Sequence, residues 1–85
     1  MATILERLKK IIANDLGVDE DSIEPSSSFT EDLNADSADL AELIAMVEEA
    51  FSTPKRKVTI SDEAIEEIST VQDLVDILRE YIPED

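Results

Sequence analysis

Residues 31–40 read EDLNADSADL and place one serine, Ser37, between the carboxylates of Asp36 and Asp39. From here onward, apolar residues recur three and four positions apart, which predicts an amphipathic helix. They are Leu40, Leu43, Ile44, Val47 and Phe51. Asp36 is a favourable N-cap for this helix, so Ser37 falls at its first position and Asp39 in its first turn. We therefore predict that Ser37 stands where a polar loop turns into a helix.

The segment that comes first in the chain predicts another helix. Thr3 and Glu6 have the spacing of a capping box, in which each side chain accepts a hydrogen bond from the other's backbone N–H. Apolar residues then recur at helical spacing as far as Leu16, and Gly17 can adopt the left-handed conformation that ends a helix. We predict a helix over residues 4–16.

A long connection, residues 18–36, separates these two predicted helices. Pro25 is followed by three serines, which indicates irregular backbone. Long loops in small domains need anchoring if they are to be ordered. We expect Phe29 and Leu33 to supply it by inserting into the core.

The chain after Phe51 predicts two more helices. Pro54 interrupts the helical pattern, and Ser61 is suited to cap a short third helix that ends near Ile68. Thr70 caps a fourth helix, which we expect Pro83 to end. Its apolar face consists of Val71, Leu74, Val75, Leu78 and Ile82.

These elements predict an all-α fold. It is a four-helix bundle with a short third helix and a long loop between the first two helices. No alternating apolar run long enough for a sheet is present. A chain of 85 residues is the size of one small domain, so we expect residues 1–85 to form a single unit.

Charge limits the partners that this chain can have. The net charge is −15, from 22 acidic and 7 basic residues, and so negative a field repels nucleic acid and anionic lipid and favours electropositive proteins. Three of the basic residues form the run Lys55–Lys57. Such a run can be a polyanion-binding patch, but in so acidic a chain we favour a solvated loop that relieves the negative field.

Composition also argues against an enzyme. The chain has no cysteine and no histidine, and therefore no thiolate nucleophile, no usual zinc site and no imidazole base. No apolar run approaches the ~20 residues that span a bilayer. We expect a cytoplasmic, monomeric protein that is not itself a catalyst.

Three kinds of chemistry remain for residues 31–40. Asp32, Asn34 and Asp36 match the first ligand positions of a calcium loop, but Ser37 and Leu43 stand where the loop needs glycine and glutamate, so we predict no metal site. A catalytic serine needs a neighbouring base, which the sequence does not supply. The third possibility is that another enzyme modifies the Ser37 hydroxyl, although a serine at a helix start is usually only a cap.

The chain resembles an acyl carrier protein of the bacterial fatty-acid-synthase type. The resemblance runs over nearly the whole length and rests on ERLKKII (6–12), LGV (16–18), FTEDL (29–33), ADS (35–37) with Asp39, EL (42–43), EEAF (48–51) and ISTVQD (68–73). It implies that Ser37 carries 4′-phosphopantetheine, which a phosphopantetheinyl transferase donates from coenzyme A. The thiol of that arm would hold acyl groups as thioesters, in a chain that has no cysteine of its own.

The resemblance also implies a pocket and a docking surface. Acyl chains in this family can lie between the helices, and the corresponding wall here is Phe29, Leu33, Leu43, Ile44, Val47, Ile60 and Ile68. Acyl-chain-processing enzymes present basic patches to the second helix, and the expected contacts here are Asp36, Ala38, Asp39, Glu42, Glu48 and Glu49. These same residues also suit an ordinary core and a solvated helix face.

The sequence departs from the family pattern at three places. Asn34 stands at the usual glycine, and asparagine tolerates positive φ better than most residues. Ala38 replaces the usual leucine after the serine, and residues 54–58 resemble an insertion that brings the basic run. The leading hypothesis is an acyl carrier in fatty acid biosynthesis. The alternatives are a specialised carrier for a polyketide or another acyl-transfer pathway, or an unmodified acidic interaction module.

Overall fold

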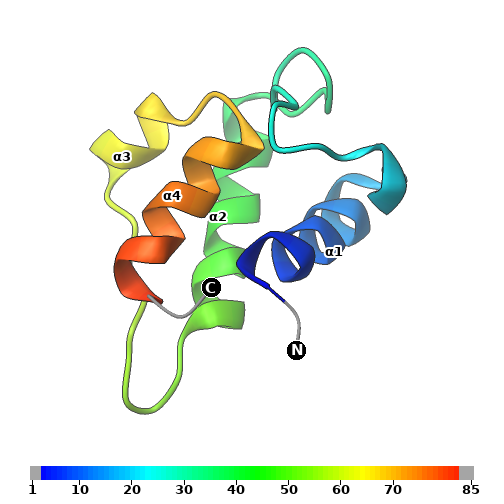
Figure 1. Cartoon of the computed structure of the whole chain (residues 1–85). Helices are drawn as coiled ribbons and strands as arrows, with labels where there is room; N and C mark the ends of the chain where they lie inside the picture. The colour runs from blue at the N-terminus through cyan, green and yellow to red at the C-terminus, as the bar shows by residue number, and fades with distance from the viewer. Residues whose placement is uncertain (1–2, 83–85) are drawn as a thin grey trace.

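Residues 3–82, the part of the chain that the computed structural model describes, contain four helices and one 3₁₀ turn joined by loops (Figure 1). The helices are α1 (Ile4–Leu16), α2 (Ser37–Phe51), α3 (Asp62–Glu67) and α4 (Val71–Tyr81), and the turn is η1 (Glu20–Ser22). The only β-type pairings among these residues are two isolated bridges, Ser28 with Thr70 and Thr53 with Arg56. The predicted all-α fold, with its short third helix and long first connection, is confirmed.

Each helix begins at the predicted cap, because a side-chain oxygen there accepts an N–H that the helix leaves unpaired. The caps are Thr3, Asp36, Ser61 and Thr70. For α1 the structure shows the first half of the predicted box, the Glu6 N–H donating to Thr3 Oγ1 at 3.1 Å. Gly17 ends α1 at φ 68°, as predicted. Pro83, expected to end α4, lies outside the described residues.

Helix α1 packs across both α2 and α4. The centre of its apolar stripe is enclosed, with Leu8 and Ile12 at 0% exposure, and Leu5, Ile11 and Leu16 flank it as partly buried residues. Arg7 also joins α1 to α2: its guanidinium lies 4.2 Å from the centre of the Phe51 ring and donates to the Ala50 carbonyl at 3.2 Å. The carbonyl end of a helix carries partial negative charge, so this cation stabilises the end of α2.

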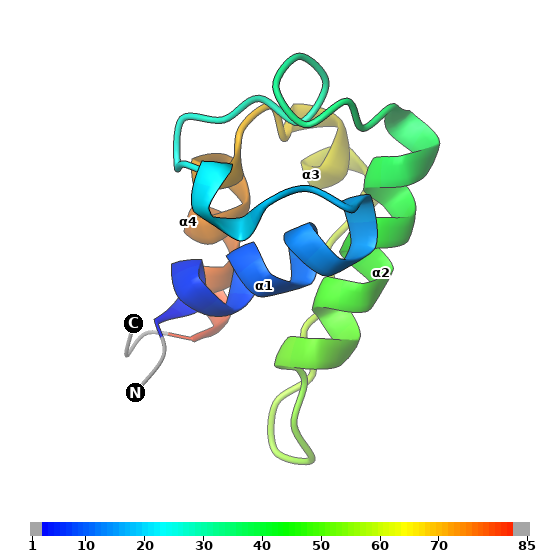
Figure 2. The ribbon, with the colours of Figure 1, turned by 90° about the vertical axis from the view of Figure 1, so that its right-hand side faces the viewer.

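The connection between α1 and α2 is ordered by the start of α4. The N–H groups of Val71 and Gln72, left unpaired by α4 itself, donate to the carbonyls of Ser27 and Pro25 at 3.1 and 2.9 Å. The N–H of Phe29 returns a bond to the Ser69 carbonyl at 3.0 Å. Figure 2 shows this segment crossing the end of the bundle where α2 begins.

Phe29 and Leu33 are buried at 1% and 5% exposure, which confirms them as the anchors of the connection. Ile23 is a third anchor, at 1%, whereas Val18 is only partly buried against the core. No helix among residues 3–82 has the length and apolar character that crossing a membrane requires.

Asp73 provides a test of the junction between the long connection and the start of α4. Its carboxylate accepts the N–H groups of Ser69 at 2.9 Å and Thr70 at 3.0 Å, and these bonds hold the pKa of Asp73 below its ordinary value. Because folding lowers the pKa of Asp73, the contribution of its carboxylate to stability is present above about pH 3.9, the ordinary aspartate pKa. This contribution is lost as the pH falls through the pKa of Asp73 in the folded protein. Asp73→Asn should cost about 1 kcal/mol at neutral pH, and the difference from wild type should shrink below about pH 4.

Urea denaturation at several pH values measures this difference. Glu80→Gln is the matched control, because it removes the same charge from an exposed position near the other end of α4. A carboxylate near a helix C-terminus is slightly unfavourable, so the control should lose no stability. Equal losses in the two variants, or a loss in Asp73→Asn that does not depend on pH, would contradict the assignment.

Candidate functional site

Ser37 is the first residue of α2 and is exposed. No hydrogen bond involves its hydroxyl in the part of the chain that the structure describes. The capping work is done by its neighbours: the Asp39 N–H donates to Asp36 Oδ1 at 2.9 Å, and the Asp36 N–H donates to Asp39 Oδ2 at 3.3 Å. Ser37 is therefore a free hydroxyl at the positive end of a helix, between two carboxylates that are already engaged.

The turn before Ser37 depends on Asn34. This residue has φ 57°, the one positive φ at a non-glycine residue among those described. The next N–H, that of Ala35, donates to the Phe29 carbonyl at 2.7 Å, and Ala35 itself is buried at 1% exposure. The left-handed residue thus reverses the chain from the buried Leu33 and leads it into Asp36 and α2. The expectation that asparagine could replace a glycine here is confirmed.

Substitution of Asn34 should separate backbone strain from packing, because the side chain is exposed. Asn34→Ala should lower the free energy of unfolding by about 1 kcal/mol, since alanine carries the full left-handed penalty. Asn34→Gly should be neutral or slightly stabilising, because glycine adopts a positive φ without a steric penalty. Urea denaturation of both variants measures the difference, and equal stability would show that the positive φ costs nothing.

A mainly apolar concavity lies beside Ser37, between the start of α2 and α3, with a volume of about 290 Å³. Leu40, Ile65 and Ile68 form its apolar wall, and its polar edge consists of Thr30, Asp36, Ser37 and Glu66. Ligand pockets for drug-sized molecules usually span ~300–1,000 Å³. The concavity is therefore just below that range and suits a slender apolar group attached near Ser37.

The seven residues expected to form an acyl-chain wall all lie in the core, at exposures of 0–7%. They pack closely against one another, and only Ile68 lines the concavity beside Ser37. The sequence did not predict that Leu40 and Ile65 line this concavity. Leu40 was readable, because it lies three positions after Ser37 on the same helix. Ile65 was not, because only the packing of α3 brings it to this end of α2.

The expected docking residues lie along α2, and five of the six are exposed: Asp36, Ala38, Asp39, Glu42 and Glu49. Glu48 departs from the prediction that it faces solvent. It is half-buried, and its Oε2 accepts the Ile60 N–H at 2.6 Å. The carboxylate turns toward the loop after α2 because that loop presents an N–H with no helical partner.

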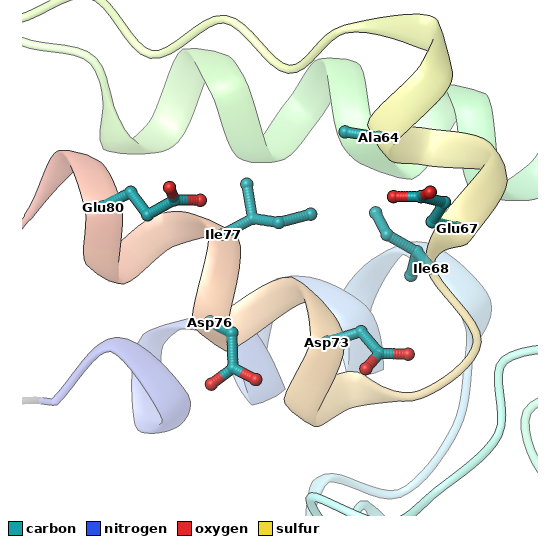
Figure 3. A pocket seen from close by; sticks show the side chains of 7 residues that line it. All are labelled: Ala64, Glu67, Ile68, Asp73, Asp76, Ile77 and Glu80. Atoms are coloured by element: carbon teal, nitrogen blue, oxygen red, sulfur yellow. The ribbon is translucent and has the colours of Figure 1, made fainter.

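A second concavity, which shares Ile68 with the first, lies between α3 and α4 (Figure 3). Four carboxylates and three apolar side chains line it: Glu67, Asp73, Asp76, Glu80, Ala64, Ile68 and Ile77. Two of these carboxylates already have partners, Asp73 in the cap of α4 and Asp76 with the Gln72 side chain at 2.8 Å. Ser37 is not part of it, so it is a less suitable candidate for covalent chemistry.

The sequence matches the family described as phosphopantetheine attachment site over residues 6–78. The chain belongs to this family. Its fold is that of an acyl carrier protein: the crystal structure of an acyl carrier protein from Thermotoga maritima is similar, with a TM-score of 0.75 and 26% sequence identity. The similarity covers 99% of this chain and 98% of that chain. The resemblance seen in the sequence is thus confirmed.

The prosthetic group of this family is 4′-phosphopantetheine, attached covalently. Such an arm needs a hydroxyl that is exposed, free of structural hydrogen bonds and placed where a phosphodiester is tolerated. Ser37 meets these requirements, because its hydroxyl has no hydrogen-bond partner among the described residues and the N–H groups at the start of α2 attract anions. The Asp36 and Asp39 carboxylates oppose that attraction in part. The residues present therefore fit the group.

Proposed function

We propose that this chain carries acyl intermediates as thioesters on a 4′-phosphopantetheine arm attached to Ser37, in fatty acid biosynthesis. It acts as a single carrier domain, residues 1–85, in the cytoplasm and as a monomer, and the catalysis belongs to its partners. The observation that supports this best is the Ser37 hydroxyl itself, which is exposed at the start of α2 beside an apolar concavity and has no hydrogen bond to any residue from 3 to 82.

The residues around Ser37 have two different roles, capping of α2 and provision of an apolar surface. Asp36 and Asp39 cap α2 through their mutual bonds, so they fix the position of Ser37 instead of acting as bases. When bound, the arm supplies the thiol that a chain without cysteine lacks. Leu40, Ile65 and Ile68 offer an acyl chain a surface away from water, which is favourable by about 0.8 kcal/mol for each buried CH₂.

The partners are a phosphopantetheinyl transferase and acyl-chain-processing enzymes. An enzyme that reaches Ser37 must approach the exposed face of α2, where Asp39, Glu42 and Glu49 are exposed. Electrostatic complementarity then calls for a basic surface on the enzyme, which also speeds encounter with a carrier of charge −15.

Mass spectrometry tests the proposal directly. The wild-type protein is incubated with coenzyme A and a broad-specificity transferase, and the product is digested to locate the added mass. We expect one phosphopantetheine per chain, on the peptide that contains Ser37. No addition under conditions that fully modify a control carrier would contradict the proposal and favour an unmodified acidic interaction module.

The pathway needs a second measurement. The modified protein is loaded with a malonyl group and offered to purified enzymes of fatty acid elongation. Turnover comparable with that of a fatty-acid carrier supports the proposed pathway. A protein that accepts the arm but not these enzymes would instead be a specialised carrier for a polyketide or another acyl-transfer pathway, in keeping with Ala38 and the basic segment at residues 55–57.

A further inference from the structure

The segment between α2 and α3 carries a fixed basic tip. Lys55, Arg56 and Lys57 are all exposed there, and a turn holds them together: the Thr53 and Arg56 backbones exchange N–H to carbonyl bonds of 2.7 and 3.1 Å. We call Lys55–Lys57 the basic tip. In both views of the ribbon it extends beyond the end of α2 opposite to Ser37 (Figures 1 and 2).

The base of this loop is fastened to the bundle. Ser52 Oγ donates to the Glu48 carbonyl at 2.6 Å and accepts the Val58 N–H at 3.0 Å, and the Glu48 carboxylate accepts the Ile60 N–H. Val58 is buried at 2% exposure. The Tyr81 hydroxyl donates to the Thr59 carbonyl. The basic tip is thus presented in a defined position.

The cations of the basic tip form no ion pair within residues 3–82. The structure records one ion pair among residues 3–82, between Arg79 and Asp76, and none that involves Lys55, Arg56 or Lys57. The chain has 22 acidic residues, so partners for these cations are abundant. Lys57 lines a concavity together with Glu48 and Glu49 but forms no ion pair with either, so the three cations remain available to another molecule.

The basic tip continues the exposed face of α2. Ala38, Glu42, Ala45 and Glu49 are exposed and spaced four, three and four apart, so they form one stripe that starts next to Ser37. A concavity at the far end of this stripe is lined by Ala45, Glu49 and Lys57, among others. The surface formed by the stripe and the basic tip therefore changes sign along its length, from acidic at Glu42 and Glu49 to basic at Lys55–Lys57.

One enzyme interface can span α2 from Ser37 to the neighbourhood of the basic tip. Helix α2 has 15 residues and is therefore about 22 Å long. A standard interface buries about 800 Å² on each partner. An enzyme that covers Ser37 and the stripe therefore comes close to the basic tip, whose charges act over a Debye length of about 8 Å at physiological salt and about 30 Å at 0.01 M.

We propose that the basic tip selects among partner enzymes. It favours an enzyme that carries acidic side chains beside its basic carrier-binding surface, and it repels an enzyme whose surface is basic throughout. This rests on the proposed function, because it concerns enzymes that act at Ser37. Specificity of this kind comes as much from repulsion of wrong partners as from attraction of the right one.

A polyanion is a poorer match for the basic tip than an acidic protein surface. Nucleic acid and anionic lipid present many negative charges, which would meet the remaining field of a chain of net charge −15. A small acidic cluster on a protein can contact three cations without covering the rest of the carrier.

The test compares two double variants with the same change in net charge. K55E/K57E reverses two charges of the basic tip, and K9E/K10E reverses two charges on α1. The probe is a broad-specificity phosphopantetheinyl transferase chosen because the surface around its active site is basic throughout. Apparent KM for each protein is measured at about 10 mM and about 150 mM salt, where screening differs strongly. Thermal unfolding by circular dichroism confirms that both variants fold.

We expect K55E/K57E to lower KM about fivefold at low salt, with a smaller effect at high salt and little effect of K9E/K10E. Equal KM values for the two variants, no change, or a higher KM for K55E/K57E would each overturn the inference. Absence of modification in wild type as well would contradict the proposed function itself. Sedimentation with vesicles of phosphatidylserine and phosphatidylcholine is a second check: binding by wild type that K55E/K57E loses would assign the basic tip to lipid and overturn the inference.

Discussion

Ser37→Ala should abolish attachment of phosphopantetheine and leave the fold intact. The hydroxyl is the atom that would form the phosphodiester, and alanine has no atom to replace it. The hydroxyl makes no hydrogen bond within residues 3–82, and the cap of α2 belongs to Asp36 and Asp39, so the fold does not depend on it. We expect no added mass after exhaustive treatment with coenzyme A and transferase, and a melting temperature within a few degrees of wild type.

Ser26→Ala is the matched control for this variant. Ser26 is an exposed serine in the connection before α2 and should be modified neither in wild type nor in any variant. Its substitution should therefore leave the mass gain unchanged. Full modification of Ser37→Ala, or loss of modification in Ser26→Ala, would show that the attachment site has been misplaced.

Phe29→Ala should have the largest effect on stability. The ring is 1% exposed and anchors the connection that leads to Ser37, while the backbone of the same residue bonds to Ser69 and Ala35. Removal of a buried phenylalanine costs about 3–5 kcal/mol, and a chain of 85 residues has roughly 4–13 kcal/mol in total at ~0.05–0.15 kcal/mol per residue. Thermal unfolding should show a fall of at least about 12 °C, since 1 kcal/mol corresponds to about 4–8 °C at this size.

Met46→Ala is the comparison for Phe29→Ala. Met46 is a large apolar residue on α2 but is 37% exposed, and its truncation leaves no enclosed cavity. We expect a loss below about 1 kcal/mol. Similar falls in melting temperature for the two variants would mean that Phe29 does not anchor the connection as the packing indicates.

The helices were the most predictable part of the molecule. Thr3, Asp36, Ser61 and Thr70 were all identified from sequence as caps, because N-cap chemistry is local and needs only a side-chain oxygen near an unpaired N–H. Gly17 was likewise readable from its residue type, whereas the positive φ of Asn34 was expected because it stands where the family pattern has glycine and asparagine tolerates that conformation. For the reciprocal Asp36–Asp39 cap, the sequence predicted Asp36 as the N-cap but not the return bond to Asp39, because aspartate at the third position is not the usual partner in a capping box.

Contacts between distant segments were less predictable. The carbonyls of Ser27 and Pro25 complete the start of α4, and the Glu48 carboxylate holds the Ile60 N–H. Periodicity placed Glu48 on the solvent side of α2. The spacing of apolar residues shows which face of a helix is polar, but it does not show that a loop covers part of that face. The concavity beside Ser37 was missed for the same reason, since Ile65 reaches it only through the packing of α3.

The sequence by itself determined where the helices begin and which of their faces are buried, because these properties depend on side-chain chemistry and on spacing within a few turns of chain. The expectation that Ser37 accepts an arm came from the resemblance to acyl carrier proteins and not from spacing. The tertiary structure decided which core side chains stay accessible beside Ser37, which carboxylates of α2 remain free, and where the basic tip lies. Those properties depend on which segments, far apart in the chain, pack together and exclude water. The residue pattern within one segment does not record its packing partners.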